Sequence, residues 1–177
     1  MPSKLGRSNK SKYALTGWIM TTYYTYTQSP VGRLMLTANE QALTGLYFST
    51  GNRARTTPDD SWQRRDTHFN QARQELDEYF EHRRRCFDVT LEPSATPFQS
   101  RVLEALRTIP YGEVRSYKQI AEAIGSPKAM RAVGNANGNN PLAIFIPCHR
   151  VVGSNGALTG FGGGLEAKQY LLGLELD

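Results

Sequence analysis

Cys148 is followed directly by a histidine and an arginine, in the segment Pro147-Cys148-His149-Arg150-Val151. An imidazole can accept the thiol proton, and a nearby cation lowers the pKa of a thiol, so this setting favours a nucleophilic thiolate. Thiolates attack soft alkyl carbons as well as carbonyl carbons. Neighbouring side chains on a strand point to opposite faces, however, so adjacency alone does not bring His149 to the sulfur. Taken alone, the pair favours a structural cysteine.

The residues before Cys148 form an apolar run, Leu142 to Ile146, bounded by Pro141 and Pro147. Its length and composition predict a buried strand. Such a strand would deliver Cys148 to its end, at the edge between core and solvent.

Glycine-rich sequence follows the cysteine. Ser154-Asn155-Gly156 predicts a turn, and Gly160-Phe161-Gly162-Gly163-Gly164 predicts a loop whose backbone N–H groups could face a ligand. This loop lacks the lysine and the spacing of a phosphate-binding P-loop. It could equally be a connector into a last helix over 165–174. The leucines of that helix are expected in the core: Leu165, Leu171, Leu172 and Leu174.

Clear helix signals begin at Thr96. Thr96, Pro97 and Gln99 combine an N-cap, a proline at the first helical position and a capping-box glutamine. Pro110-Tyr111-Gly112 ends this helix. Its buried stripe is expected at Phe98, Val102, Leu106 and Ile109.

Two short helices follow in the arrangement of a helix-turn-helix. Ser116 and Gln119 form a second capping box for a helix that Gly125 ends, and Ser126-Pro127 opens a helix running to about Asn137. The spacing fits a DNA-binding motif, although helical hairpins of this kind are often only structural.

The second of these helices carries little side-chain bulk. Small residues at Ala129, Ala132 and Gly134 would let its backbone approach another surface closely, and Lys128 and Arg131 supply positive charge. The same small residues would also suit tight packing against neighbouring helices.

The N-terminal half predicts a small α/β unit. Three strands are expected, at Thr21–Thr27, Arg33–Thr37 and Leu43–Phe48. A loop over 51–67, a helix over 71–82 and a returning strand over 86–91 complete it. The pattern changes at Glu92-Pro93-Ser94-Ala95. We therefore expect an α/β domain over residues 20–92 and a mainly helical domain over residues 93–177.

Composition places few further limits on function. The chain has 177 residues and a formal net charge of +5. Residues 1–19 are basic without acidic residues, which predicts a flexible solubilising extension more than a nucleic-acid arm. No apolar run could span a membrane and no signal peptide precedes the first domain, so we expect a cytoplasmic protein. Two cysteines and three histidines, without zinc-site spacing, predict reduced thiols and no metal.

The segment from Pro147 to Val151, with Asn140-Pro141 before it and Gly163-Gly164 after it, resembles the active-site segment of O6-alkylguanine-DNA alkyltransferases. The resemblance runs almost continuously from Thr96 to Glu175 and more loosely over the N-terminal half. It implies a ribonuclease H-like sheet domain, followed by a helical domain with a winged-helix-like helix-turn-helix.

The resemblance also implies an activity, that of a methylated-DNA–protein-cysteine methyltransferase. Such a protein repairs DNA by direct reversal, because it moves a methyl or other alkyl group from O6 of guanine to its own cysteine and works once. O4-alkylthymine is a further candidate substrate. The implied partner is double-stranded DNA containing O6-alkylguanine, bound by a monomer without a cofactor.

The resemblance assigns catalytic roles to four residues. Cys148 would accept the alkyl group, His149 would take the thiol proton through a water, and Glu175 would orient and stabilise that histidine. Tyr117 would donate to N3 of the guanine, because guanine leaves poorly unless its developing charge is stabilised.

The resemblance further implies a pocket made largely of backbone. Backbone groups at Cys148 and Val151 would read the exocyclic amine, and the amide near Gly162 would face O6. Phe161 and Gly163 complete the implied pocket, whose tolerance for bulky alkyl groups the sequence leaves open.

Base flipping is implied as well, since O6 of a stacked guanine is out of reach of a buried thiol. Arg131 would fill the space that the base leaves, and the recognition helix would enter the minor groove. Asn140 would be the hinge between the helix-turn-helix and the active-site strand. The implied DNA-binding residues are Ser116, Lys128, Ala129, Arg131, Ala132 and Gly134.

Two branches of the family differ from this chain. The chain lacks the N-terminal ligands of the zinc-containing branch, so it resembles the metal-free bacterial type. A branch with tryptophan at the acceptor position only flags lesions, and Cys148 argues against it. A lesion-binding protein without transfer, and a Cys-His hydrolase acting on acyl groups, remain as alternatives.

Overall fold

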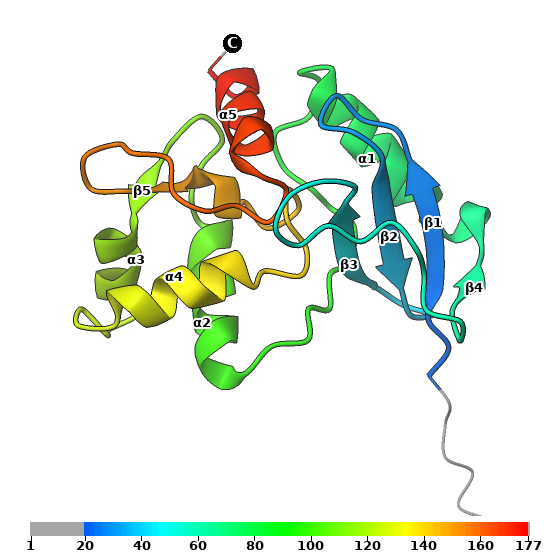
Figure 1. Ribbon diagram of the computed structural model, residues 1–177, viewed down its shortest axis with the longest axis horizontal. Coiled ribbons are helices and arrows are strands. Elements are labelled where there is room, and N and C mark those ends of the chain that lie inside the picture. The colour runs from blue at the N-terminus through cyan, green and yellow to red at the C-terminus, as the bar shows by residue number, and fades with distance from the viewer. Residues whose placement is uncertain (1–19, 177) are drawn as a thin grey trace, which may run out of the picture.

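The computed structural model describes residues 20–176, so the extension predicted over residues 1–19 lies outside the described residues. The chain forms two halves that lie side by side, a small sheet with a helix and a group of helices (Figure 1). The predicted order, an α/β half followed by a mainly helical half, is confirmed.

The N-terminal half is built on one sheet. Its strands are β1 (Tyr23–Thr27), β2 (Leu34–Ala38), β3 (Leu43–Phe48) and β4 (Gln63–Arg64). They lie in the order β3-β2-β1-β4, with β1, β2 and β3 antiparallel and β4 parallel to β1. The three strands expected from the sequence are therefore present.

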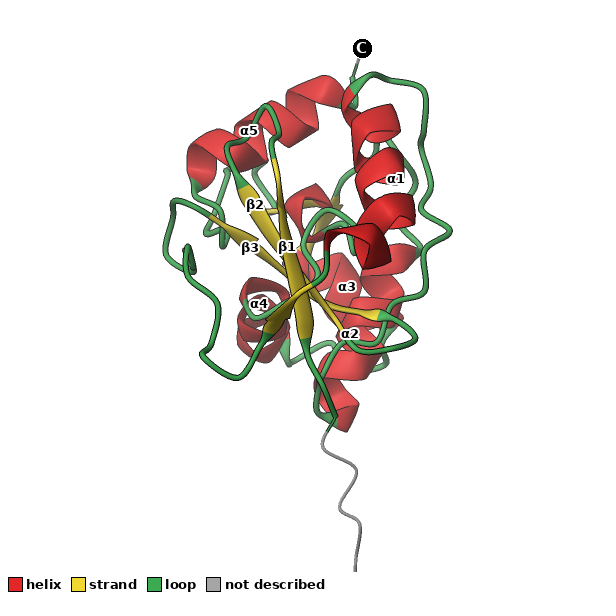
Figure 2. Cartoon of the chain, turned by 90° about the vertical axis from the view of Figure 1, so that its right-hand side faces the viewer, coloured by secondary structure: helices red, strands yellow, loops and turns green. Residues whose placement is uncertain are grey.

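Burial alternates along β1, whereas all five residues of β2 are buried. Thr25, Leu36 and Leu46 lie in one row across β1, β2 and β3, and all three are buried. Helix α1 (Asn70–Phe80) packs beside the sheet (Figure 2) and buries Leu76 and Tyr79. The sheet and α1 thus carry one side of the core.

Two expectations for this half are wrong. The segment 51–67 is not a plain loop, because it contains β4 and the start of a 3-10 turn, η1 (Asp66–Phe69). The segment 86–91 does not form a strand. It touches β3 only through a single bridge between Leu43 and Leu91, where it turns away toward the second half and leaves the sheet.

The C-terminal half is mainly helical. Its elements are α2 (Pro97–Arg107), β5 (Arg115–Ser116), α3 (Tyr117–Ala123), α4 (Met130–Gly138), η2 (Cys148–Arg150), β6 (Val151–Val152) and α5 (Leu165–Leu174). Both predicted capping boxes are present: Thr96 with Gln99 starts α2, and Ser116 with Gln119 starts α3. Gly125 ends α3 with a φ of +70°.

Three local expectations for this half need correction. Helix α4 begins at Met130 and not at Ser126, because residues 126–129 form a turn closed by Ala129 N–H on Ser126 O. Leu165, expected in the core, is 50% exposed at the first position of α5, and Leu172 is half-buried. Leu171 and Leu174 are buried as expected.

The apolar segment before Cys148 is buried, but it is not a strand. Ile144 has a φ of +73°, which a strand cannot contain, and Ile146 N–H donates to Leu142 O, so the segment folds back on itself. The Asn140 side chain completes this turn, because its Nδ2 donates to Ile146 O at 2.8 Å and its Oδ1 accepts from Leu142 N at 3.0 Å. These bonds replace the partner strand that the backbone would otherwise need.

One contiguous core joins the two halves. Buried side chains of the sheet and of α1 belong to the same cluster as those of α2, α4, the turn over 142–146 and α5. The position of the C-terminal half therefore depends on packing against the N-terminal half.

Replacing Asn140 tests this turn. We expect Asn140→Ala to lower the free energy of unfolding by about 2–4 kcal/mol, since two buried backbone groups lose their partners. Urea unfolding measures the change, and Asn139→Ala, at the exposed neighbouring position, is the matched control. Equal stability of the two variants would contradict the role of Asn140 in holding the turn.

Candidate active site

A single turn of 3-10 helix places the residues that follow Pro147. In η2 the side chains of Cys148, His149 and Arg150 are all buried, and they are not arranged as alternating residues of a strand. His149 Nε2 lies 2.7 Å from Oε1 of Glu175, which directly follows α5. The predicted association of His149 with Glu175 is therefore present in the fold.

The protonation of His149 follows from this contact. Burial lowers the pKa of His149 despite the hydrogen bond to Glu175, so the imidazole is neutral near pH 7. The ionised carboxylate can only accept, so Nε2 carries the hydrogen and Nδ1 keeps its lone pair. Nδ1 is buried and has no hydrogen-bond partner among the described residues. It is a free base inside the protein.

Several donors surround the Glu175 carboxylate. Arg150 holds it with two bonds, from Nε to Oε2 at 2.8 Å and from Nη2 to Oε1 at 2.9 Å. Tyr79 Oη donates to Oε1 at 2.7 Å, and Gly112 N–H donates to Oε2 at 3.3 Å. Burial by itself would raise the pKa of Glu175, but the bonds from His149 and Arg150 outweigh it and hold the pKa at about 2.

The thiol of Cys148 differs from the expectation. The side chain is 3% exposed and lies within the core, not at its edge. Burial raises the pKa of the thiol to about 11, against the lowering effects of a hydrogen bond with Asn140 and of the charges of Lys168 and Arg53. Arg150 does not stabilise a thiolate as predicted, because Glu175 neutralises its charge. Cys148 is therefore a thiol in the resting protein and needs a base.

Cys148 lines an inner cavity of about 360 Å³ between the two halves of the chain. Asn137, Asn140 and Ala143 of the C-terminal half lie on one side, and Phe48 and Arg53 of the N-terminal half on the other. The cavity is large enough for a small substituent next to the sulfur.

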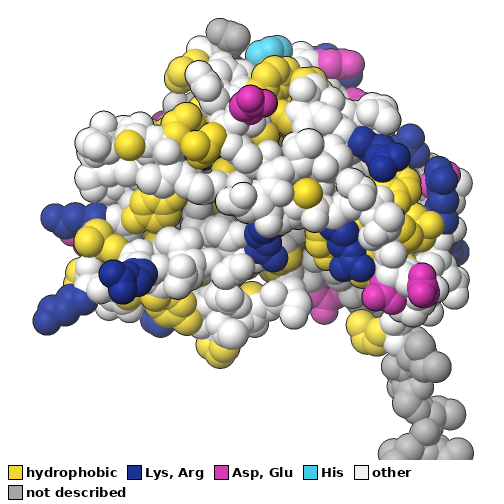
Figure 3. Space-filling view, viewed as in Figure 1, with side chains coloured by type: hydrophobic (Ala, Val, Ile, Leu, Met, Phe, Trp, Pro, Cys, Tyr) yellow, Lys and Arg dark blue, Asp and Glu magenta, His cyan; other side chains and the backbone are white. Residues whose placement is uncertain are grey.

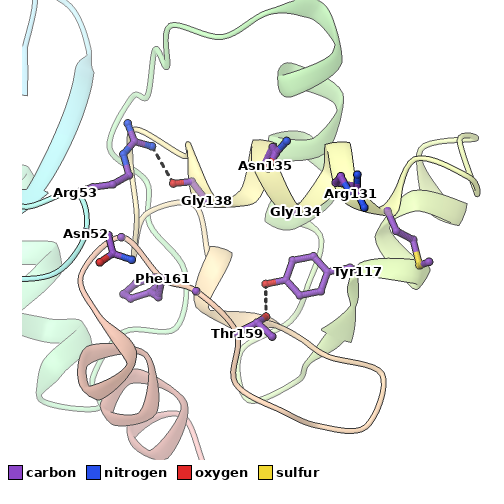
Figure 4. A pocket seen from close by; sticks show the side chains of 12 residues that line it. Asn52, Arg53, Tyr117, Arg131, Gly134, Asn135, Gly138, Thr159 and Phe161 are labelled. Carbon is purple, nitrogen blue, oxygen red and sulfur yellow. Dashed lines mark hydrogen bonds between the residues drawn. The ribbon is translucent and has the colours of Figure 1, made fainter.

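An outer cavity of about 610 Å³ adjoins the inner one, and Arg53 and Gly162 line both. Tyr117, Arg131 and Phe161 line the outer cavity (Figure 4). Tyr117 Oη and Thr159 Oγ1 are 2.8 Å apart, so the phenol is held across the opening by the loop after β6. This cavity can accommodate a planar ring, and the Tyr117 phenol and the Arg131 guanidinium line it.

The N-terminal half holds the glycine-rich loop in place. A Cβ atom at Gly51 would meet the backbone of Gly162–Gly164 at 2.5 Å, and one at Gly163 would meet the Phe48 ring at 2.7 Å. Arg53 N–H donates to Gly162 O at 3.1 Å, and Arg53 Nη1 donates to Gly138 O at 2.9 Å. The loop is thus packed between two domains and is not a free connector.

The predicted DNA-binding residues gather on one side. Lys128, Arg131 and Ala132 are exposed on or just before α4, whereas Ala129 and Gly134 are half-buried. Of this group only Arg131 and Gly134 line the outer cavity. Ser116 is occupied as the N-cap of α3. Figure 3 shows basic side chains over α3 and α4 and across the middle of this face.

Sequence reasoning missed two buried side chains that hold backbone carbonyls of the site. Lys168 is fully buried, and its Nζ donates to Val151 O at 2.6 Å and to Thr159 O at 2.9 Å. Asn137 Nδ2 donates to Cys148 O at 3.4 Å. The carbonyls of Cys148 and Val151 thus each accept a bond from a buried side chain. The one signal available in the sequence was Lys168, a lysine on the apolar face of the last helix.

Tyr79, Arg150 and Arg53 were also missed as site residues. Arg150 was predicted only as a nearby charge, and it is instead the bidentate partner of Glu175. Tyr79 and Arg53 come from the other domain, where no local pattern points to the site.

Two further structural findings concern membrane-spanning helices and metal-binding clusters. None of the helices within residues 20–176 is long and apolar enough to cross a membrane. Over the same residues, no group of three or more His, Cys, Asp or Glu side chains could hold a metal ion.

A buried thiol, a neutral histidine adjacent in sequence, an open cavity and a helix-turn-helix are together the parts expected of a thiol-dependent protein that acts on nucleic acid. Comparison with known proteins agrees. Residues 22–93 match the family described as 6-O-methylguanine DNA methyltransferase, ribonuclease-like domain, and residues 97–176 match its DNA binding domain. The chain belongs to the 6-O-methylguanine DNA methyltransferase family.

Individual relatives are similar over most of the chain. A methylated-DNA–protein-cysteine methyltransferase of Methanosarcina acetivorans is 47% identical over 153 residues, which cover 86% of this chain and 97% of the relative. The crystal structure of an O6-methylguanine methyltransferase of Mycobacterium tuberculosis has a TM-score of 0.81 at 45% identity, covering 88% of this chain and 93% of that one. A Mycobacterium tuberculosis relative solved in complex with DNA has a TM-score of 0.80 at 46% identity, with coverage of 87% and 92%.

The lowered pKa of Glu175 predicts a pH dependence of stability. A carboxyl group with a folded-state pKa of about 2, against an ordinary 4.5, stabilises the fold above pH 4.5 and loses this contribution as the pH falls toward 2. The contribution is about 3 kcal/mol. We expect Glu175→Gln to remove this contribution, so that the free energy of unfolding in urea falls less steeply between pH 4.5 and 2 than in the wild type.

The control for this experiment is Glu166→Gln, at an exposed carboxylate in the first turn of α5. Its pH dependence should match that of the wild type. Parallel curves for the wild type and Glu175→Gln between pH 4.5 and 2 would show that the carboxylate is not stabilised in its charged form.

Proposed function

We propose that this protein repairs DNA by direct reversal, as a methylated-DNA–protein-cysteine methyltransferase that moves a methyl or other alkyl group from O6 of guanine to Cys148. The observation that carries the proposal is the buried Cys148 thiol at the inner end of a cavity whose outer part holds Tyr117 and Arg131. The similarity to methyltransferases over 86% of the chain supports it.

The transfer begins with loss of the thiol proton. His149 Nδ1 has a free lone pair, and Glu175 fixes the ring through Nε2, so His149 takes the proton through a water and Glu175 stabilises the imidazolium that forms. Because burial raises the pKa of Cys148 to about 11, the thiolate forms only together with this proton transfer. Such a thiol stays inert until a substrate is present.

The alkyl group then changes partners. The sulfur attacks the alkyl carbon, the S–C bond forms, and the bond between that carbon and O6 breaks. The electron pair of the broken bond stays on guanine, where Tyr117 donates to N3 and stabilises the charge. The proton held on His149 offsets the negative charge left on guanine, and transfer of one proton from His149 to guanine through water returns both to their neutral forms. The thioether at Cys148 is stable, so each molecule works once.

Recognition of the base follows from the same cavity. The target guanine leaves the duplex, because a buried thiol cannot reach O6 within a base stack. Arg131 of α4 fills the vacated space, while Ala129, Ala132 and Gly134 let the helix lie close to the minor groove. Lys128 and Ser116 contact the phosphates, and Asn140 joins α4 to the active-site turn. Phe161, Gly162 and Gly163 bound the pocket, and the carbonyl of Val151 reads the exocyclic amine.

The proposal includes a monomeric, cytoplasmic protein whose substrate is double-stranded DNA containing O6-alkylguanine.

Stoichiometry tests the proposal directly. Incubation with a duplex containing O6-methylguanine should add one methyl group to the peptide containing Cys148, at one equivalent per protein, as measured by mass spectrometry. Cys148→Ser should take up none, because its hydroxyl is a far weaker nucleophile. Cys86→Ser, which replaces the exposed cysteine, is the matched control and should react like the wild type.

The alternatives predict other results. Tight binding of the lesion without a methyl adduct would favour a lesion-binding protein. Turnover of an activated ester over many equivalents would favour a hydrolase.

Arg131 is tested by separating base flipping from chemistry. We expect Arg131→Ala to slow transfer from duplex DNA by about tenfold or more, since extrusion of a base costs a few kcal/mol, and to leave transfer from free O6-benzylguanine nearly unchanged. Single-turnover rates with both substrates measure this. Arg83→Ala, at an exposed arginine after α1, is the control. Equal slowing with duplex and free base would overturn the flipping role.

A further inference from the structure

Tyr79 connects the N-terminal domain to the residues around Cys148. Its ring is fully buried at the end of α1 and packs against Phe80, Phe87 and Tyr111. Its hydroxyl donates to Glu175 Oε1 at 2.7 Å, across 96 positions of sequence. This bond is the direct polar contact of α1 with the carboxylate that holds His149.

Three donors share the oxygen that Tyr79 reaches. Glu175 Oε1 accepts from Tyr79 Oη at 2.7 Å, from His149 Nε2 at 2.7 Å and from Arg150 Nη2 at 2.9 Å. A carboxylate oxygen offers about two lone-pair sites, so three donors compete for them and each bond weakens the others. The strength of the bond between His149 and Glu175 therefore depends on the tyrosine hydroxyl.

The hydroxyl is a permanent donor. Burial raises the pKa of Tyr79 far above its ordinary value, and the neighbouring Glu175 carboxylate raises it further. Tyr79 therefore keeps its proton in neutral and mildly alkaline solution, where an ordinary tyrosine is also protonated, and acts there as a constant donor to Glu175.

We propose that Tyr79 is a positioning residue for alkyl transfer, whose hydroxyl sets how firmly Glu175 holds the imidazole of His149. The proposal deepens the proposed function and rests on it, because His149 must act as the base for Cys148. Under this proposal the N-terminal domain affects alkyl transfer, because Glu175 has the Tyr79 donor only when α1 is docked on the C-terminal domain.

The proposal predicts the direction of a pH effect. Without the Tyr79 hydroxyl, Glu175 Oε1 has one donor fewer and binds the Nε2–H of His149 more strongly. The pKa of His149 then rises, so the imidazole keeps a proton on Nδ1 up to a higher pH. Below that raised pKa the ring is already protonated and cannot serve as a base. The other charged groups that act on His149 are Arg150 and Lys168, and the substitution leaves both in place.

The experiment measures single-turnover methyl transfer from an O6-methylguanine duplex by the full chain, from mildly acidic to alkaline pH. We expect Tyr79→Phe to move the acid limb of the rate profile upward by roughly half a pH unit or more. The rate at the optimum should fall by roughly two- to tenfold, the value of one hydrogen bond. A general loss of rate with an unmoved acid limb would overturn the proposal, because a packing defect has that signature.

Tyr23→Phe is the matched control. Tyr23 is also a buried tyrosine of the N-terminal domain whose hydroxyl donates to a carboxylate, that of Glu40, which lies outside the relay. Its substitution should leave the acid limb where the wild type has it. A shift equal to that of Tyr79→Phe would show that the effect is not specific to Glu175 and would overturn the proposal.

A second variant keeps the test informative should Tyr79→Phe fold poorly. Site-specific Tyr79→3-fluorotyrosine retains the ring and the hydroxyl, and its more acidic phenol is a stronger donor to Glu175. It should move the acid limb to lower pH, opposite to Tyr79→Phe, and an unmoved limb would overturn the proposal. Failure of the wild type to methylate Cys148 would instead contradict the proposed function, so the two failures are distinguishable.

Discussion

The buried carboxylate of Glu175 is the constraint on which the rest of the site depends. A charge inside the protein is tolerated only when donors satisfy it, and here the donors come from α1, from the turn at Gly112 and from η2. His149 and Arg150 of the C-terminal domain hold the carboxylate in its charged form, and Tyr79 of the N-terminal domain adds a further donor. The bond from His149 Nε2 to the same carboxylate fixes the imidazole in the tautomer that leaves Nδ1 without a hydrogen, as the proposed role of His149 requires.

The reactivity of Cys148 follows from burial more than from its sequence neighbours. The adjacent histidine and arginine suggested a thiolate, yet burial raises the pKa of the thiol to about 11 and Arg150 is paired with Glu175. A thiol that is largely un-ionised at rest is protected from other electrophiles. Under the proposed function, in which each molecule reacts once, this protection is useful.

The cavities depend on the N-terminal domain as much as on the helix-turn-helix. Gly51 and Arg53 pack against the glycine-rich loop, and Arg53 also reaches the end of α4. The small sheet domain, in which the sequence shows no chemistry, thus forms one wall of the space next to Cys148. It further supplies the Tyr79 hydroxyl, which donates to Glu175.

The sequence by itself determined the elements whose signals are local. The capping boxes at Thr96 and Ser116, the stop at Gly125 and the order of the two domains could be predicted because they depend on neighbouring residues. The short motif around Cys148 indicated the family. Only the tertiary structure decided that the segment before Cys148 is a turn, because the bonds of the Asn140 side chain replace a partner strand. Tertiary packing likewise decided the raised pKa of the Cys148 thiol and the contacts of Tyr79, Arg53 and Lys168 with the site. Desolvation and contacts between distant segments produce no periodic pattern in a sequence, so the sequence could not predict them.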